Sequence, residues 1–437
     1  MTSSWLSPAP SEVTVSRISL DFGLRAADFF FRELVVPGLG RIWFARQLSW
    51  PLAALAIHEE ITSRGWNTRK PTAICHGIEA LSCKLQYVID KRGKPKDGEE
   101  LRSRRILGRR AFDHDTDTEV WAFEKLCQRQ FYVQNTHRQA ATRALHVERG
   151  LGFVQGPRFD LLELEPVGHD LANAFLNQSV GRGGMKLRTW LVGWLRGEKK
   201  QPSLGDSFVR ALSPEYPSKE ERERVRARLI DANTQNSREA KEKRQQLARA
   251  IGPEAEMPDI DRSVLVRLCA AGNRQQANEI ATARAFGAML DRARDVIAVL
   301  TSDRLGIGRR PEPVSVLVKD KKLGRAIGCL RAATKNYADK AKTAAVTEPT
   351  SLAFADAVAA ADDGEVIRLT ARRAGEVLGL ADGSVSRGAL FRAIDATDEI
   401  GTLEDGVASI EPDRTGRTFR IANFHSLLRD VNPRGAR

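Results

Sequence analysis

Residues 351–397 read SLAFADAVAA ADDGEVIRLT ARRAGEVLGL ADGSVSRGAL FRAIDAT, and this stretch decides the fold predicted for the C-terminal part of the chain. The Ala-rich segment 352–361 predicts a first helix, and 365–369 has the composition of a short strand. Thr370 is a good N-cap for a second helix over 371–378, because its hydroxyl can accept from the free amides of the first turn.

The chain after this second helix predicts a turn, a third helix and a hairpin. Glycines in 379–383 supply the turn, and Ser384 caps a helix that ends near Thr397. Two strand-like stretches follow, 406–411 and 417–422, separated by a Pro-Asp-Arg-Thr-Gly turn. The order helix, strand, helix, turn, helix and hairpin resembles the winged helix-turn-helix superfamily in its arrangement.

The resemblance to winged helices implies a DNA-binding role for residues of the third helix, the second helix and the wing. The third helix would enter the major groove, the second would lie over the phosphate backbone, and the wing tip would approach a minor groove. The residues so assigned are Ser386, Arg387 and Arg392 on the third helix, Arg372 and Arg373 on the second, and Arg414 and Arg417 at the wing. The alternative is a winged helix that contacts protein and whose arginines are solvated.

The charge of the whole chain agrees with a polyanionic partner. The 437 residues include 69 Lys and Arg against 56 Asp and Glu, which gives a net charge of +13 and a pI near 9.7. Cations placed on phosphates release condensed counterions, which favours binding to nucleic acid. Two basic runs, 91–110 with Arg104 and Arg105, and 319–342 with Lys321, Lys322 and Arg325, predict a shared surface that follows phosphates. Each run taken singly is more typical of a solvated face, and the two together with the basic C-terminal domain favour the shared surface.

The remaining sequence predicts a mainly α, multi-domain protein. We expect an N-terminal helical domain over 1–205, a charged helical middle domain over 206–345 and the winged helix over 348–437. Pro51 predicts a helix start or a kink, Pro71 opens a helix, and Ser218 with Glu221 has the spacing of a capping box at the start of a long charged helix.

Cysteine usage and hydropathy predict a reduced, cytoplasmic protein without a membrane partner. The five cysteines are scattered and have no Cys-x-x-Cys pair, which argues against a disulfide framework and a zinc ribbon. The N-terminus lacks the pattern of a signal peptide, and the apolar run 50–57 is too short to cross a bilayer.

Acidic and histidine residues over 113–146 are the alternative, catalytic feature of the sequence. Asp113, Asp115, Asp117 and Glu124 match four positions of a calcium loop, but Thr118 stands where that loop needs glycine. His114, His137 and His146 lie close by in sequence, so a metal-dependent nuclease is an alternative function. The turn 181–186, GRGGMK, lacks Walker spacing, and we expect no cofactor, no metal and no catalytic residue.

Two short landmarks, 34–57 and 282–300, resemble an uncharacterised bacterial family found in anti-phage defence islands. The matching positions are Pro37, Gly38, Arg41, Arg46, Trp50, Arg284, Phe286, Gly287 and Ala288. Because such proteins are encoded beside helicases, nucleases or methyltransferases, the resemblance implies a defence-system subunit and brings no known activity with it.

Together these features predict a non-catalytic DNA-binding component of a prokaryotic nucleoprotein complex, in anti-phage defence or on a mobile element. DNA is the expected partner, with RNA as the alternative, and other protein subunits would complete the complex. A nucleic-acid-binding subunit of an RNA-guided, CRISPR-like effector complex is the rival interpretation, beside the metal-dependent nuclease.

Overall fold

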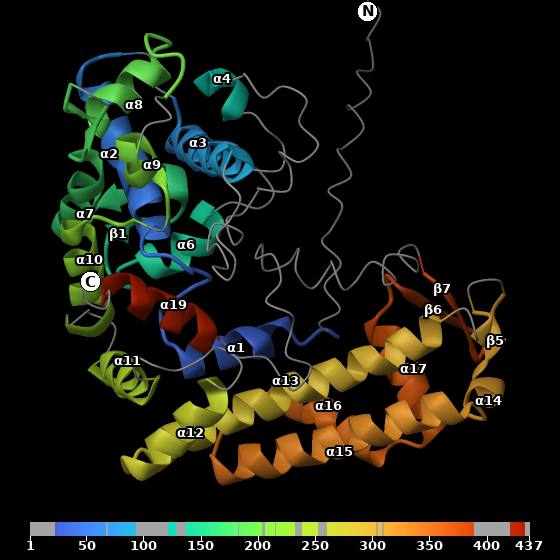
Figure 1. Cartoon of the computed structure of the whole chain (residues 1–437). Coiled ribbons are helices and arrows are strands. Elements are labelled where there is room, and N and C mark those ends of the chain that lie inside the picture. The colour runs from blue at the N-terminus through green and yellow to red at the C-terminus, as the bar shows by residue number, and fades with distance from the viewer. Residues whose placement is uncertain are drawn as a thin grey trace, which may run out of the picture.

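The computed structural model describes residues 22–66, 69–92, 121–127, 137–181, 183–202, 206–214, 216–231, 238–251, 260–302, 305–307, 310–388 and 420–432. Helices dominate this part of the chain, and its strands form small antiparallel sheets, which confirms the predicted mainly helical class. Figure 1 shows two groups of helices, one around α2 and one that contains the long helices α13 and α15.

The first group is built around α2 (Arg46–Ser63), most of whose side chains are buried. A helix that is apolar on nearly every side is stable when other helices enclose it. Its principal neighbours are α3 (Pro71–Arg92), α6 (His137–Leu145), α7 (Pro166–Leu176) and α8 (Leu187–Leu195). Pro71 opens α3 as predicted, whereas α2 begins before Pro51 and continues through it, so Pro51 does not start a new helix.

Short elements complete the first group. Two hairpins pair β1 with β2 and β3 with β4, and a 3-10 turn lies between the strands of the first hairpin. The elements are α4 (Phe123–Leu126), β1 (Val154–Gln155), η3 (Phe159–Leu161), β2 (Glu163–Leu164), β3 (Ser179–Val180), β4 (Met185–Lys186) and α9 (Asp206–Leu212).

The predicted capping box is present at the start of α10 (Lys219–Arg226). The amide of Glu221 donates to the hydroxyl of Ser218 at 3.1 Å, and the amide of Ser218 donates to the Glu221 carboxylate at 2.8 Å. A π-helical turn, η4 (Ala227–Asp231), continues α10, and α11 (Arg238–Ile251) follows.

The second group contains α12 (Ile260–Ala270), α13 (Arg274–Thr301), α15 (Lys321–Thr343) and α16 (Pro349–Ala360). α13 packs along α15, and α16 covers a further face of α15 (Figure 1). One end of this group carries α14 (Val314–Leu317), α17 (Asp363–Arg373) and a sheet of order β5-β7-β6, formed by Glu312–Pro313, Ser384–Arg387 and Leu378–Ala381.

Two helices connect the groups. α1 (Arg25–Val35) lies on α13, where the Phe31 ring stacks on Phe286 with 4.6 Å between ring centroids. α19 (Ile421–Val431) lies against α10, α11 and α12, and its Asp430 accepts from the amide of Ala45 at 2.9 Å. Because the buried apolar residues form one large continuous cluster, the domain boundaries near 205 and 345 stay predictions.

The predicted strand over 365–369 is wrong, since this segment belongs to α17. Asp362 caps the helix by accepting from the amide of Glu365 at 2.7 Å. Val366, Ile367 and Thr370 are buried with helical spacing, so packing favours a helix where the local composition had indicated a strand. The predicted second helix over 371–378 is also wrong, because α17 already ends at Arg373 and β6 starts at Leu378.

The predicted third helix from Ser384 is wrong over 384–387, which form strand β7. Asp382 and Gly383 have φ values of 49° and 71°, and two successive positive φ values make the tight turn of a two-residue β-hairpin. The Asp-Gly pair therefore joins two strands instead of two helices. The rest of the predicted third helix, the predicted strand 406–411 and positions 417–419 of the second predicted strand lie outside the described residues. In the remainder of that strand, Arg420 is the N-cap of α19, and Ile421 and Ala422 begin the helix.

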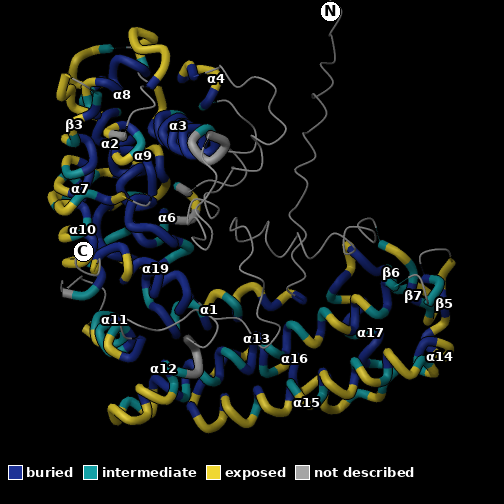
Figure 2. The backbone as a smooth tube through the Cα atoms, in the orientation of Figure 1, coloured by how far each residue is buried: buried dark blue, intermediate teal, exposed yellow. Residues whose placement is uncertain are grey.

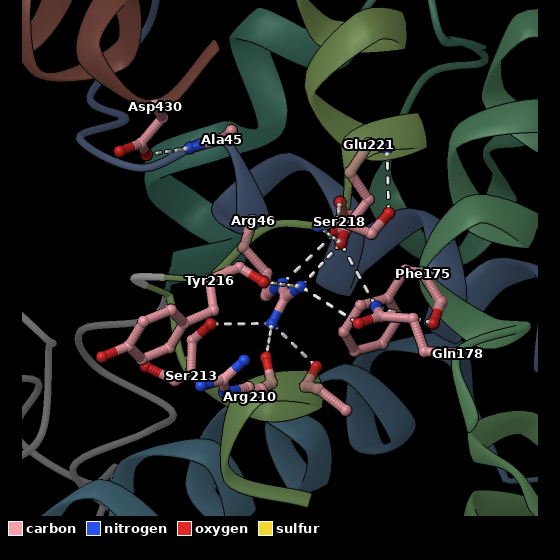
Figure 3. Close-up of polar contacts among 12 residues, drawn as sticks. Ala45, Arg46, Phe175, Gln178, Arg210, Ser213, Tyr216, Ser218, Glu221 and Asp430 are labelled. Atoms are coloured by element: carbon pink, nitrogen blue, oxygen red, sulfur yellow. Dashed lines mark hydrogen bonds and ion pairs between the residues drawn. The ribbon is translucent and has the colours of Figure 1, made fainter. Parts of the chain in front are cut away.

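A buried arginine holds several segments of the first group together (Figure 3). Arg46, at the start of α2, is fully buried and forms an ion pair with buried Glu221 of α10 at 2.6 Å. The same guanidinium lies 5.5 Å from the ring centroid of Phe175 on α7.

The Arg46 guanidinium also donates to the backbone carbonyls of the chain between α9 and α10. Three of these bonds run to Arg210, Ala211 and Ser213 at 2.6, 2.9 and 2.7 Å, and a fourth runs to Tyr216 at 2.6 Å. The Glu221 carboxylate in turn accepts from the Ser49 hydroxyl at 2.7 Å. Since both charges are hydrogen-bonded on all sides, the pair can be buried at a tolerable cost.

Glu221→Gln should lower the free energy of unfolding by about 3–5 kcal/mol, because it leaves the Arg46 charge buried without a counter-ion. Urea unfolding followed by circular dichroism measures this loss. The control is Glu223→Gln, which removes an exposed carboxylate whose ion pair with Lys219 is 3.8 Å long, and it should change stability by less than about 0.5 kcal/mol. Equal losses in the two variants would contradict the role given to the buried pair.

Candidate nucleic-acid interface

The long helix α15 separates apolar and charged side chains onto opposite faces. Asp320 caps its start by accepting from the amides of Lys322 and Leu323, each at 2.9 Å. The buried side of α15 packs against α13 and α16. In the C-terminal half of α15, the Tyr337 hydroxyl lies 2.5 Å from the Ser351 hydroxyl of α16. Burial raises the pKa of Tyr337 to about 12. The residues of the buried face are Leu323, Ile327, Leu330, Thr334, Tyr337 and Ala341.

The opposite face of α15 carries cations that have no acidic partner in the part of the chain that the structure describes. The helix has seven Lys and Arg residues and one acid, Asp339. Only Arg331 among these cations forms an ion pair with a described residue, through Asp363 at 2.5 Å. Figure 2 shows the outer edge of α15 exposed along its length. We call this the cationic face of α15, and its exposed members are Lys321, Lys322, Arg325, Lys335, Lys340 and Lys342.

The end of the second group adds two exposed arginines to this surface. Arg387 closes β7 and has no ion pair with a described residue, whereas exposed Arg372 of α17 pairs with Glu365 at 3.4 Å. α14 contacts both β5 and α17 and leads directly into α15, so the start of the cationic face and the β-hairpin lie at the same end of the molecule (Figure 1).

The other residues predicted for this site have structural partners. Arg373 donates to the carbonyl of Phe22 at 2.7 Å and lies 5.1 Å from the Phe354 ring centroid, and burial lowers its pKa. Ser386 is partly buried in β7, with its hydroxyl facing Gly379 of the neighbouring strand. Arg104, Arg105, Arg392, Arg414 and Arg417 lie outside the described residues.

Lys321, Lys322 and Arg325, which the sequence predicts for the site, all lie on the cationic face. Lys335, Lys340 and Lys342 belong to the same basic run and lie on this face too, but they are not among the predicted residues. Helical periodicity predicts that these three lysines are exposed, because the apolar residues of α15 fall on one face of the helix and the lysines fall on the other.

The residues proposed for a metal site are not brought together in the described part of the chain, where no group of three candidate ligands occurs. Exposed Glu124 pairs with Arg69 at 2.5 Å. His146 has its Nε2 2.9 Å from the Gly156 carbonyl, and its Nδ1 accepts from the Glu148 amide. The acids at 113, 115 and 117 and His114 lie outside the described residues, as does the side chain of His137.

Two further polar features do not form a reactive site among the described residues. The described residues of the GRGGMK segment, 181 and 183–186, span the turn between β3 and β4 and the strand β4, and they lie at the surface. An open hollow of about 560 Å³ between α2, α7 and α8 is lined by opposite charges that already pair, with Arg188 donating to Glu60 at 2.8 Å and to Asn173 at 2.6 Å.

The residues of the two defence-family landmarks lie mainly in the interior. Trp50 and Phe286 are fully buried, Arg46 is the centre of the network in Figure 3, and Gly38 donates its amide to Glu33 at 2.9 Å. Trp43, Trp50, Trp190 and Trp194 are all buried in the core.

The chain matches no protein-family model, and searches of curated proteins and of solved structures found no similar protein. No helix among the described residues is both long and apolar enough to span a bilayer.

A buried histidine on α3 makes stability depend on pH. His76 is 4% exposed, and its Nε2 has no hydrogen-bond partner among the described residues. Burial, with a smaller contribution from Arg138, lowers its pKa from 6.5 to about 4. Since the folded state holds the neutral ring, this contribution to stability is complete above pH 6.5 and is lost as the pH falls toward 4.

We expect His76 to account for up to about 3 kcal/mol of the stability lost between pH 6.5 and 4. His76→Gln should therefore show a shallower decrease over that window, when urea unfolding is measured at several pH values. The variant and the wild type having the same slope would contradict this.

Proposed function

We propose that this protein is a non-catalytic DNA-binding subunit of a prokaryotic nucleoprotein complex, and that the cationic face of α15 contacts DNA phosphates. The observation that carries the proposal is the absence of acidic partners for Lys321, Lys322 and Arg325 and for three further lysines among the described residues. Unpaired, exposed cations are free to replace the counterions of a phosphate backbone.

The strand arrangement supports a winged-helix-like module whose helix and strands occupy other residues than the sequence predicted. Helix α17 leads into the β6–β7 hairpin, and β7 pairs on its other side with β5. In this proposal the hairpin is the wing and α17 is the helix before it, which places Arg372 and Arg387 toward DNA. Winged helices contact DNA through the helix that precedes the wing and through the wing itself.

The larger setting rests on the net charge of +13 and on the two defence-family landmarks. The charge supports a subunit that binds nucleic acid, and the landmark resemblance supports a setting in which other proteins of an anti-phage or mobile-element complex perform the chemistry.

Replacing Lys321 and Lys322 together by Glu should weaken binding to duplex DNA by about tenfold or more at physiological salt, because two phosphate contacts become repulsions. Fluorescence anisotropy with a labelled duplex measures the affinity. The matched control is Lys199→Glu with Lys200→Glu, which makes the same change in charge on an exposed turn after α8, far from α15 in Figure 1.

The control variant should keep at least about a third of the wild-type affinity, since only long-range charge is altered. Equal losses in both double variants would show that net charge alone decides binding and would contradict an interface on α15.

A further inference from the structure

The cations of α15 lie in two groups separated by a bare stretch. Lys321, Lys322 and Arg325 occupy the first turns, and Lys335, Lys340 and Lys342 occupy the last. Arg325 and Lys335 are about 15 Å apart along the axis at 1.5 Å per residue. The exposed residues between the two groups are small: Gly328, Cys329 and Ala332.

The separation of the two groups fits the two strands that border a groove of duplex DNA. The major groove is about 12 Å wide, so long lysine and arginine side chains spaced as on α15 can reach phosphates on both of its edges. The small residues then lie over the groove itself. The charges of this face would repel a second copy of the same face, which argues against self-association through α15.

The chemistry of this face favours a duplex over a single strand and favours backbone contacts over base reading. Single strands are held by aromatic rings on which bases stack, and the one aromatic residue of α15, Tyr337, is buried. Base pairs are distinguished by long polar side chains that reach base edges. The one long polar side chain of the bare stretch, Arg331, is half-buried and is held by Asp363 and the Ala361 carbonyl. Phosphate contacts position a protein on DNA without reading its sequence.

The two glycines on the solvent side of α15 are not required by the fold. A Cβ atom added at Gly324 or at Gly328 would meet no atom within 4 Å. Glycine inside a helix costs roughly 0.5–1 kcal/mol relative to alanine. Without a Cβ atom, each glycine leaves room for a duplex to lie close to the helix backbone beside the cations.

Resting on the proposed function, we infer that α15 lies across a groove of duplex DNA and binds both bordering strands through phosphates, independently of base sequence. The two groups of cations carry this inference, and the small residues between them allow the helix to lie close to the duplex.

The test measures the affinity of the full-length protein by fluorescence anisotropy for duplexes of unrelated sequence and equal length, for the matching single strands and for double-stranded RNA. We expect the duplexes to differ by less than about threefold, far below the discrimination of a sequence-specific protein, and to bind more tightly than the single strands. Tighter binding to double-stranded RNA than to duplex DNA would overturn the choice of DNA.

The variants Gly328→Gln and Gly328→Ala separate close approach from helix stability. Both should raise or preserve the melting temperature, because both residues favour helix more than glycine does. Gln at 328 should reduce duplex affinity about fivefold or more, because it holds the helix away from the duplex and the attraction between the cations and the phosphates falls as their separation grows. Ala is small and should leave the affinity within about twofold of the wild type.

The outcomes separate the proposed DNA-binding function from the inferred binding of α15 across a groove. Binding to no nucleic acid at all would remove the proposed function. Binding to DNA with a single-strand preference, with more than about tenfold dependence on sequence, or with wild-type affinity in Gly328→Gln would overturn the inference while leaving DNA binding in place.

Discussion

The buried ion pair between Arg46 and Glu221 is the interaction on which the first group of helices depends. It joins the start of α2 to the first turn of α10, and the remaining guanidinium donors fix the chain between α9 and α10 through its carbonyls. A buried charge pair is stable only when its hydrogen bonds are complete, so every atom of this network is committed to structure. The polar network around Arg46 is therefore a scaffold.

Most of the positive charges of α15 are exposed at the surface, whereas that of Arg46 is buried and paired. Arg46 and Arg373 are satisfied by carboxylate or carbonyl oxygens inside the protein, whereas Lys321, Lys322 and Arg325 face solvent without acidic partners in the described chain. Packing against α13 and α16 fixes the apolar side of α15 and thereby the direction of its charges. A helix packed in this way fixes the backbone positions of its cations, so the proposed binding of a polyanion would need to order only their side chains.

Local signals made some of the structure predictable from sequence. The capping box of Ser218 and Glu221, the helix opened by Pro71 and the amphipathic run of α15 each depend on residues within a few positions of one another. The segment 362–387 was mispredicted for two reasons. The pairing of β7 with β5 joins residues far apart in sequence, such as Glu312 and Val385. The Asp382–Gly383 pair, by contrast, is a local signal of a two-residue β-hairpin, and the sequence prediction interpreted it as a turn between helices.

The candidate interface was likewise predictable only where it depends on residues close together in sequence. The sequence of α15 shows which cations share a face, but the pairing of Arg331 with Asp363 and of Arg373 with the Phe22 carbonyl depends on the tertiary fold. The most direct test of the account is the salt dependence of duplex DNA affinity for the wild type and for Lys321→Gln with Lys322→Gln. We expect the logarithm of the association constant for duplex DNA to fall linearly with the logarithm of the salt concentration. The slope of this plot should be about 1.8 less steep in the variant, or roughly 0.9 for each lost phosphate contact. An affinity that does not change with salt, or an equal slope in the variant, would contradict it.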